Sequence, residues 1–378
     1  MEPRIRTETH TAISEIGATD WNRLAGDNPF LRHAFLNALE TTGCASPKTG
    51  WQPAHLTLHD GGRLAGAMPL YLKSHSYGEF VFDWAWADAY QRHGLRYYPK
   101  LLSAVPFSPV TGQRILGEPT ALPRLAAAAV ELAEERELSS IHCLFPNAAQ
   151  TDALSGQGWL IRTDCQFHWR NRGYRDFDDF LDTFSSAKRK KVRRERRRVA
   201  EAGIHFRVLH GGDLDGPMLN TVFRFYCLTY FERGRSPYLN REFFAAIAGH
   251  LGPALVIILA CSDSEPVAAA ICLRSGDTLY GRHWGSDQDF HSLHFETCYY
   301  QGIDYCLREG LQYFDPGAQG QHKISRGFEP TTTWSAHWIA EPEFRAAIAD
   351  YLARERPMMA EYREDAREHL PFKERADL

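Results

Sequence analysis

Two segments decide the fold: LTLHDGGRLAGAMPLYL at residues 56–72 and VIILACSDSEPVAAAICL at residues 256–273. Each has two apolar, strand-like runs around a short turn, at residues 60–62 in the first and 262–266 in the second, which is typical of a β-hairpin. An amphipathic helix and another short strand follow each hairpin. Because this order recurs, the pattern predicts a duplicated α/β domain in which mixed, mostly antiparallel sheets are flanked by helices.

The length of the chain agrees with two such copies. Its 378 residues are too many for one compact core and suit two domains of ordinary size. We place the N-terminal domain at residues 1–172 and the C-terminal domain at residues 173–378. In the second domain the pattern predicts a strand at 278–284, a helix at 293–308 and a short strand near 313. The tail from Glu343 is expected to be helical and broken at Pro357.

Composition excludes several classes of protein. The N-terminus has no apolar core of the kind that a secretory signal needs, and the longest apolar run, residues 254–261, suits a buried strand and not a membrane span. Eight scattered cysteines without a CxxC pair argue against a zinc site or a disulfide framework and fit a reducing compartment. We therefore predict no metal site and a cytoplasmic protein, and leave open its peripheral attachment to the inner face of the membrane.

A strongly basic run stands out within a chain whose net charge is only -4. Residues 188–198 hold nine cations and one anion, and a helix is expected to continue through them. Such a run is either a solvated helix face or a binding surface for a polyanion such as RNA, a nucleotide-linked substrate or an acidic membrane. The candidate polyanion-binding residues are Lys188, Arg189, Lys190, Lys191, Arg193, Arg194 and Arg197.

A first candidate site lies between residues 82 and 100. Two acids, a histidine and three cations occur there among several aromatic rings, and ligand sites often combine a few polar groups with rings. The alternative is an irregular loop whose rings only pack on the domain. Asp83 is a candidate proton acceptor. The candidate substrate-binding residues are Trp84, Trp86, Asp88, Tyr90, Arg92, His93, Tyr97 and Lys100.

A second candidate site combines the end of a strand, residues 280–285, with the start of a helix, residues 294–300. The first turn of that helix offers free N–H groups to an anion. A pair of Glu296 with Tyr299 or Tyr300, its neighbours on a helix, could hold an amine and supply an acid to a leaving group. The alternative for Glu296 is a first-turn carboxylate that the helix dipole favours. His294 is a further catalytic candidate, and its alternative is an ordinary capping or buried histidine. Arg282 and Trp284 are candidate substrate-binding residues of the strand.

A third candidate site is the loop at residues 314–328, which follows a short strand. Its glycines allow the backbone to approach a ligand closely, and its cations suit a phosphate or a carboxylate. It contains neither a Walker motif nor a dinucleotide-binding fingerprint. The candidate residues are Asp315, Gly317, Gln319, His322, Lys323 and Arg326.

Five segments resemble the Fem-like branch of the GNAT acyltransferase superfamily, in particular bacterial proteins called predicted N-acyltransferases of peptidoglycan biosynthesis. They are residues 80–112, SSAKRKKVRRERR (185–197), YGRHWG (280–285), LHFETCYYQGIDYC (293–306) and FDPGAQGQHKISRGFEP (314–330). The resemblance implies tandem GNAT-like domains, with an acyl donor held where the strand at 278–284 and the strand near 313 splay apart.

The resemblance also implies a reaction: an aminoacyl group passes from tRNA to an amine of a cell-wall precursor. The chain lacks the long coiled-coil insertion that some Fem enzymes carry for tRNA. It also lacks, at residues 285–294, the R/Q-x-x-G-x-G/A string with which acetyl-CoA enzymes bind pyrophosphate. We therefore predict an acyltransferase without a tightly bound cofactor. Its donor is aminoacyl-tRNA, bound through residues 188–198, or an acyl-CoA, and its acceptor is a small-molecule or peptide amine.

Two alternatives remain open. One is an acyl-CoA-dependent N-acetyltransferase with an atypical pyrophosphate loop. The other is a non-catalytic protein that binds RNA or a peptidoglycan precursor. The sequence does not predict the oligomeric state.

Overall fold

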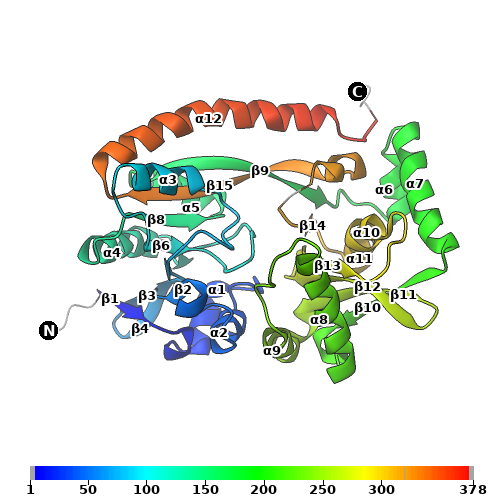
Figure 1. Ribbon diagram of the computed structural model, residues 1–378, viewed down its shortest axis with the longest axis horizontal. Helices are drawn as coiled ribbons and strands as arrows, with labels where there is room; N and C mark the ends of the chain where they lie inside the picture. The colour runs from blue at the N-terminus through cyan, green and yellow to red at the C-terminus, as the bar shows by residue number, and fades with distance from the viewer. Residues whose placement is uncertain (1–4, 319, 374–378) are drawn as a thin grey trace. The chain divides into compact units, whose positions relative to one another are not determined.

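The computed structural model describes residues 5–318 and 320–373 (Figure 1). The chain divides into two compact units: unit 1 holds the residues up to 165 together with 332–361, and unit 2 holds residues 166–331 together with those from 362 onward. The sequence predicts a single boundary, at 172–173. The structure differs from this prediction mainly because residues 332–361 belong to unit 1 and not to the second unit. Three elements run from one unit into the other: β9 (Leu160–Arg170), β15 (Glu329–Ile339) and α12 (Pro342–Glu368).

Unit 1 contains the first hairpin, made of β3 (His55–Asp60) and β4 (Arg63–Met68). Gly61 and Gly62 in its turn have φ angles of 59° and 84°, the positive values that a tight two-residue hairpin turn needs. The strands β1 (Ile5–His10) and β7 (Leu116–Gly117) complete an antiparallel sheet in the order β1-β3-β4-β7.

A second set of strands in unit 1 has the order β2-β5-β6-β8-β15. Its pairs are antiparallel except for β6 with β8, which are parallel. Its remaining members are β2 (Trp51–Pro53), β5 (Tyr71–Lys73), β6 (Lys100–Ser103) and β8 (Ser140–Leu144).

The helices of unit 1 pack an apolar stripe against these strands. In α4 (Ala121–Glu135) the buried residues Leu122, Leu125, Ala129 and Leu132 recur at helical spacing and join the core formed with Leu56, Leu58 and Met68. The other helices are α1 (Ala18–Ala25), α2 (His33–Thr41), α3 (Trp84–Arg92) and α5 (Ala148–Ser155).

Unit 2 contains the second hairpin, and its strands have the order β10-β11-β12-β13-β14-β9. Every residue of β11 except the last is buried, as its continuous apolar sequence requires. The strands are β10 (Ile204–His210), β11 (Leu255–Ser262), β12 (Glu265–Arg274), β13 (Thr278–Ser286) and β14 (Tyr313–Asp315). Its helices include α6 (Phe177–Asp182), α7 (Ser186–Glu201), α8 (Gly216–Phe231) and α9 (Arg241–Leu251).

The parallel pair β13 and β14 stays together for only three residues, from Thr278 opposite Tyr313 to Tyr280 opposite Asp315. Beyond this point β13 continues to Ser286 along β12 alone. β14 is thus paired with β13 over its whole length and ends at Asp315, and the predicted splaying of the two strands stays a prediction.

The connection between these strands is helical, as predicted, but it is not one regular helix. A π-helical turn, η5 (Glu296–Tyr300), separates α10 (Leu293–Phe295) from α11 (Gln301–Glu309). Such turns occur preferentially at functional sites.

The predicted class, mixed and mostly antiparallel sheets flanked by helices, is confirmed, but the two copies differ. In unit 2 the strand after the helix, β14, pairs in parallel with β13. In unit 1 the corresponding strand β8, which follows α4, pairs in parallel with β6 and not with β7. The prediction of a break at Pro357 is wrong: α12 continues through this residue from Pro342 to Glu368. Over the described parts of the chain, no helix is both long and apolar enough to cross a membrane.

Candidate functional site

Unit 1 encloses a network of charged and polar side chains, here called the Lys100 cluster. It consists of Lys100, Glu79, Asp83, Tyr97, His142 and His337, all less than 5% exposed. Lys100 Nζ donates to Glu79 Oε2 at 2.8 Å and to Asp83 Oδ2. Tyr97 Oη donates to Asp83 Oδ2 at 2.6 Å and lies 3.0 Å from His142 Nε2.

The two histidines of this cluster are joined directly. His142 Nδ1 lies 2.6 Å from His337 Nδ1, so one nitrogen donates and the other accepts. Burial lowers the pKa of His337 to about 3 and that of His142 well below its usual value, with Lys100 adding to the effect on His142. Both imidazoles are therefore neutral near pH 7.

The acids of the Lys100 cluster behave differently from one another. Burial raises the pKa of Glu79 to about 7, although Lys100 opposes this change. Burial also acts to raise the pKa of Asp83, but Lys100, His142 and the hydrogen bond from Tyr97 outweigh it and hold the pKa well below its usual value. Among the residues that the structure describes, Glu79 Oε1 and Asp83 Oδ1 are buried and have no hydrogen-bond partner, so the cluster keeps unused acceptors.

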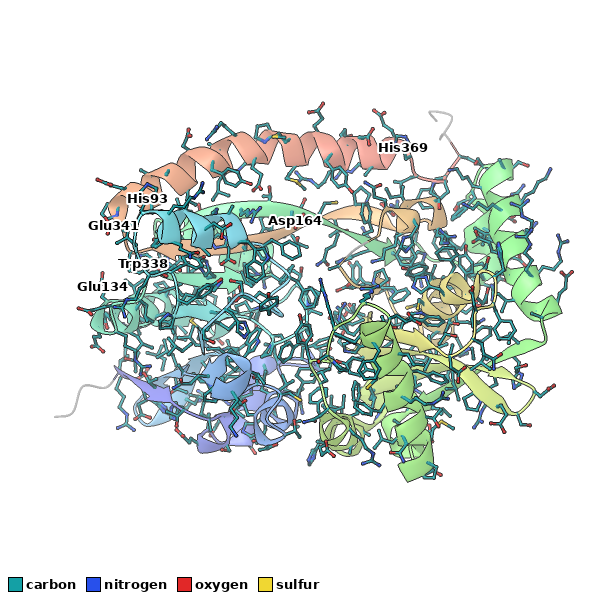
Figure 2. All side chains as sticks on the ribbon, in the orientation of Figure 1. His93, Glu134, Asp164, Trp338, Glu341 and His369 are labelled. Atoms are coloured by element: carbon teal, nitrogen blue, oxygen red, sulfur yellow. The ribbon has the colours of Figure 1, made fainter. Side chains whose placement is uncertain are left out.

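The other predicted residues of the first candidate site do not all join this cluster. The ring of Trp86 lies 4.9 Å from that of His337, and Tyr90 packs on Phe344 in a neighbouring core. Trp84 is 38% exposed and contacts Tyr77. Asp88, Arg92 and His93 are exposed, and the last two bond only to the backbone of their own helix in the described chain (His93 is labelled in Figure 2).

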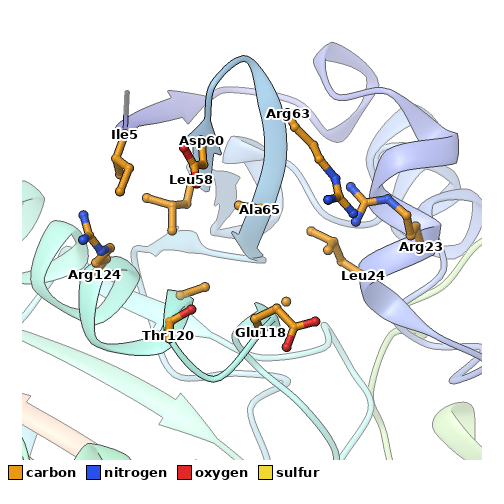
Figure 3. Close-up of a pocket in the computed structure, with 12 residues that line it drawn as sticks. Ile5, Arg23, Leu24, Leu58, Asp60, Arg63, Ala65, Glu118, Thr120 and Arg124 are labelled. Atoms are coloured by element: carbon orange, nitrogen blue, oxygen red, sulfur yellow. The ribbon is translucent and has the colours of Figure 1, made fainter. Parts of the chain in front are cut away.

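A cavity of about 830 Å³ lies elsewhere in unit 1 (Figure 3). It combines cations and anions with apolar side chains, so its lining favours neither sign of charge. Among the residues around it are Arg23, Asp60, Arg63, Glu118 and Arg124. None of the predicted site residues lines it.

In unit 2 the end of the β13–β14 pair carries a buried ion pair. Arg282 binds Asp315 through both oxygens, with Nη2 donating to Oδ2 at 2.6 Å and Nη1 to Oδ1 at 3.3 Å. Burial acts to raise the pKa of Asp315, but Arg282 and His168 outweigh it and lower the pKa to about 2. The backbone N–H of Gly317 also donates to Asp315 Oδ1 at 2.9 Å, so the glycine loop is tied to the strand end.

Lys323 lies beside this ion pair in the 3₁₀ turn η6 (Gln321–Arg326). It is 1% exposed, and its Nζ donates to the carbonyl of Gly317 at 2.5 Å. Burial lowers the pKa of Lys323 to about 8, with Arg282 adding to the effect and Asp315 opposing it. The ammonium is thus poised near neutral pH, which is common for groups in functional sites.

A group of rings surrounds the other side of this turn. Tyr299 Oη lies 2.8 Å from His322 Nε2, and His294 packs against Tyr299, His322 and Trp284. Burial lowers the pKa of His294 to about 4 and, helped by Lys323 and Arg326, also lowers the pKa of His322. His322 is exposed while Tyr299 is buried, so His322 is the member that a substrate can reach.

The helix α7 confirms the prediction that a helix continues through the basic run, and its inner face supplies two residues that the sequence analysis did not single out. Glu195 accepts from Arg326 Nη2 at 2.9 and 3.0 Å and from Tyr300 Oη. Arg196 pairs with Glu296 at 3.2 Å and with Asp304 at 2.6 Å. Val192, Glu195 and Val199 form the buried stripe of α7, so their spacing could have identified Glu195 as inward-facing.

The expected pair of Glu296 with a tyrosine does not form. The π turn instead places Gln301, five residues on, at 2.8 Å from Glu296 Oε1. Burial raises the pKa of Glu296, and Arg196 opposes this change. Arg282 and Arg326, expected to bind a ligand, are both paired within the chain, and Gln319 lies outside the described residues.

The outer face of α7 is strongly basic. Arg189 and Arg193 pair with acids of α6, and Arg197 lies 3.7 Å from Glu201. Within the described chain, Lys188, Lys190, Lys191 and Arg194 contact no acid, and the last three are exposed. This face can therefore meet a polyanion without breaking an internal ion pair.

Comparison with known proteins adds a family to this geometry. The family model FemAB-like, described as peptidoglycan biosynthesis/recognition, matches residues 12–374. No curated protein sequence matches the chain.

Three solved structures are similar to the chain. One is the C-terminal domain of a protein described as a lysylphosphatidylglycerol synthetase from Agrobacterium fabrum (11% identity, 90% of this chain and 95% of that chain, TM-score 0.54). Another is FemX (13% identity, 91% and 100%, TM-score 0.54). A tandem GNAT protein from the clavulanic acid biosynthesis pathway has 13% identity over 89% and 99%, with a TM-score of 0.45.

At these identities the first two structures show a shared fold and nothing about the reaction. The predicted fold class, two α/β units with mixed, mostly antiparallel sheets flanked by helices, agrees with these similarities.

Proposed function

Because the chain belongs to the FemAB-like family, described as peptidoglycan biosynthesis/recognition, we propose that it is an acyltransferase that moves an aminoacyl group from a carrier to an amine of a cell-wall precursor. The observation that supports this most is the end of β14 after three paired residues, beyond which β13 continues, with Lys323 bonded to the loop that follows β14. A carbonyl donor fits such a place because cations and N–H groups there can stabilise the charge that develops on its oxygen.

The reaction is a direct transfer. The amine nitrogen bonds to the carbonyl carbon of the donor, and the bond from this carbon to the carrier oxygen or sulfur breaks. The proton that the amine loses ends on that carrier atom. Orientation of the two substrates and stabilisation of the oxyanion supply most of the rate, and no covalent enzyme intermediate is needed.

We assign the oxyanion contact to Lys323. A lysine ammonium has three donors, and within the described residues Lys323 uses one of them, on the carbonyl of Gly317. Arg282 and Asp315 hold the loop that carries this carbonyl.

We assign proton removal from the amine to His322. Its lowered pKa keeps the imidazole neutral and able to accept a proton, and its ring is accessible. Tyr299 holds His322 through the 2.8 Å hydrogen bond. Glu296 is ion-paired to Arg196 and Asp83 to Lys100, so we assign these two acids to positioning.

We propose that α7 binds the carrier of the aminoacyl group, because its outer face is basic. On its inner face Glu195 pairs with Arg326, and Arg196 pairs with Glu296. An RNA-borne donor suits this face because neutralised phosphates release counterions. All eight cysteines are free thiols, which supports a reducing, cytoplasmic setting.

The test is a transfer assay with the purified protein. A precursor peptide with a free amine is mixed with labelled aminoacyl-tRNA or with acetyl-CoA, and mass spectrometry follows the acceptor. We expect a mass gain with aminoacyl-tRNA that Lys323→Met abolishes and that the surface control Lys48→Met retains. A gain with acetyl-CoA alone would favour the acyl-CoA enzyme, and no gain with either donor would favour a binding protein.

A further inference from the structure

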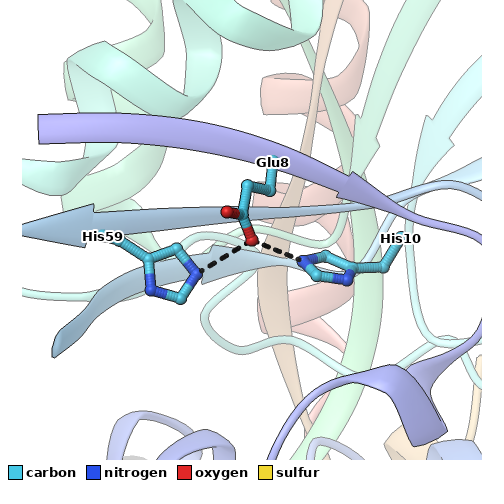
Figure 4. Close-up of side chains that lie close together, drawn as sticks. All are labelled: Glu8, His10 and His59. Atoms are coloured by element: carbon cyan, nitrogen blue, oxygen red, sulfur yellow. Dashed lines mark ion pairs between the residues drawn. The ribbon is translucent and has the colours of Figure 1, made fainter. Parts of the chain in front are cut away.

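A cluster of metal-binding side chains lies on the antiparallel pair β1 and β3, and none of its residues has a role in the proposed transfer. Glu8, His10 and His59 each offer one ligand atom, and the three atoms all lie within 4.8 Å of one another. Figure 4 shows the carboxylate of Glu8 between the two imidazole rings. We propose that these residues bind a divalent transition-metal ion, with Zn²⁺ as the best match.

The register of the two strands brings these residues together. Glu8 lies opposite Thr57 and Arg6 opposite His59, so Glu8, His10, Thr57 and His59 share one face of the pair. The other face of β3 carries Leu56 and Leu58, which are part of the core. The cluster thus rests on two paired strands and not on a loop, which favours a fixed geometry.

The distances are close to those of a tetrahedral site. Glu8 Oε2 lies 3.6 Å from His59 Nε2 and 3.8 Å from His10 Nε2. Two ligands about 2.0 Å from a tetrahedral zinc ion lie roughly 3.3 Å apart, so an ion would shorten the two distances from Glu8 by a few tenths of an ångström, and it would draw together the two histidine nitrogens, which lie within 4.8 Å of each other. Two imidazoles and a carboxylate are a common zinc ligand set that leaves a fourth position open.

Thr57 shows that both histidine nitrogens point to one place. Its Oγ1 lies 2.9 Å from His10 Nε2 and 3.1 Å from His59 Nε2. A metal ion that enters replaces these two hydrogen bonds with stronger bonds to the same nitrogens. Because Thr57 Oγ1 is close to both nitrogens, an ion bound to them would also lie near this hydroxyl.

Further groups hold the proposed ligands in place. Glu15 Oε2 lies 3.5 Å from His10 Nδ1, the nitrogen that faces away from Glu8, and Arg6 Nη2 lies 3.1 Å from Glu8 Oε1. A carboxylate behind a ligating histidine fixes its orientation and strengthens it as a ligand. The ligand side chains are 15–35% exposed, so an ion can reach them.

Titration of the metal-stripped protein with ZnCl₂, followed by calorimetry, tests this site. We expect one Zn²⁺ per chain and a rise in the apparent melting temperature, because an ion that binds only the folded state stabilises it. His59→Ala and the isosteric Glu8→Gln should each weaken binding at least tenfold, since even outer-shell partners change metal affinity by about 10–100-fold. His205→Ala, an exposed histidine on β10, should bind as the wild type does.

Co²⁺ provides a second readout on the unaltered protein. Bound at this site it should give the visible absorption of a tetrahedral nitrogen and oxygen complex, and this absorption should disappear in Glu8→Gln. If His59→Ala does not fold, as circular dichroism would reveal, Glu8→Gln decides the question. Wild-type affinity in Glu8→Gln, or no Zn²⁺ binding by the wild type, would overturn the proposal.

Discussion

Glu195, the one acid within the basic run 188–198, holds Arg326 through both carboxylate oxygens, at 2.9 and 3.0 Å. Both side chains are less than 10% exposed, and Tyr300 donates a further hydrogen bond to Glu195. The helix that offers cations to the solvent therefore also fixes the turn that carries His322 and Lys323. A ligand that bound the outer face of α7 would therefore contact the same helix that holds this turn.

The loss of Glu195 should destabilise unit 2 strongly. Glu195→Gln leaves the Arg326 guanidinium buried without its counter-charge, and breaking one partner of a buried pair costs about 3–5 kcal/mol. Urea unfolding should show this loss, whereas the exposed pair of Arg197 with Glu201 should change by less than about 1 kcal/mol in Arg197→Gln. The double variant Glu195→Gln, Arg326→Met should recover part of the loss. Equal costs for the single and the double variant would refute this account.

Lys323 should make stability depend on pH in the alkaline range. Its pKa is about 8 in the folded protein and near 10.5 when unfolded, so between these values the unfolded state binds more protons and the folded state gains stability as the pH rises. Below pH 8 Lys323 is protonated in both states, so its buried ammonium lowers the free energy of unfolding by an amount that does not change with pH. The free energy of unfolding of the wild type, relative to that of Lys323→Met, should therefore increase from pH 8 to pH 10.5 and stay level from pH 6 to pH 8. A difference that is flat across the whole range would show that Lys323 titrates normally.

The sequence predicts the elements of this protein better than their contacts. Hairpin turns, the helical spacing in α4 and the apolar run of β11 follow from local chemistry, so these elements lie close to their predicted places. The π turn at Glu296 does not follow, because a single five-residue turn shifts the helical apolar pattern too little to be distinguished from a regular helix. It moves the partner of Glu296 from a tyrosine to Gln301.

The side-chain contacts between residues that are distant in the sequence could not be predicted. His142 and His337 are 195 positions apart, and each reads only as a buried position of a strand. They become neighbours because β8 pairs with β15, with His142 directly opposite His337, and no local pattern encodes this pairing. Arg282 and Arg326 likewise read as ligand-binding cations because their acids, Asp315 and Glu195, lie 33 and 131 residues away.

Two buried lysines of unit 1 should respond to the same substitution to very different extents. Lys100 binds both Glu79 and Asp83, so Lys100→Met leaves two buried carboxylates without their cation and should cost about 3–5 kcal/mol. Lys73 donates only to the carbonyl of Tyr77 within the described chain, and burial lowers its pKa to about 7. Lys73→Met removes this desolvated ammonium and should cost at least about 2 kcal/mol less than Lys100→Met. Denaturant unfolding of the two variants makes the comparison, and equal losses would contradict it.

The outer face of α7 should control binding of the carrier without affecting stability. Replacing Lys190, Lys191 and Arg194 together by alanine removes three exposed cations that pair with no acid in the described chain. If each meets one phosphate, the slope of log K for tRNA against log salt should become shallower by about 2–3, since each phosphate contact contributes about 0.7–0.9. Fluorescence anisotropy with labelled tRNA at several salt concentrations measures this slope.

The matched control removes the same amount of charge elsewhere. Lys48, Arg136 and Arg207 are exposed cations outside α7, and their replacement by alanine changes the net charge equally. If α7 provides the contacts, this variant should keep the wild-type slope, because only counterions released at the interface contribute to it. Equal changes in the two triple variants would mean that tRNA responds to the overall charge of the protein, and the assignment of α7 as the carrier-binding surface would then be wrong.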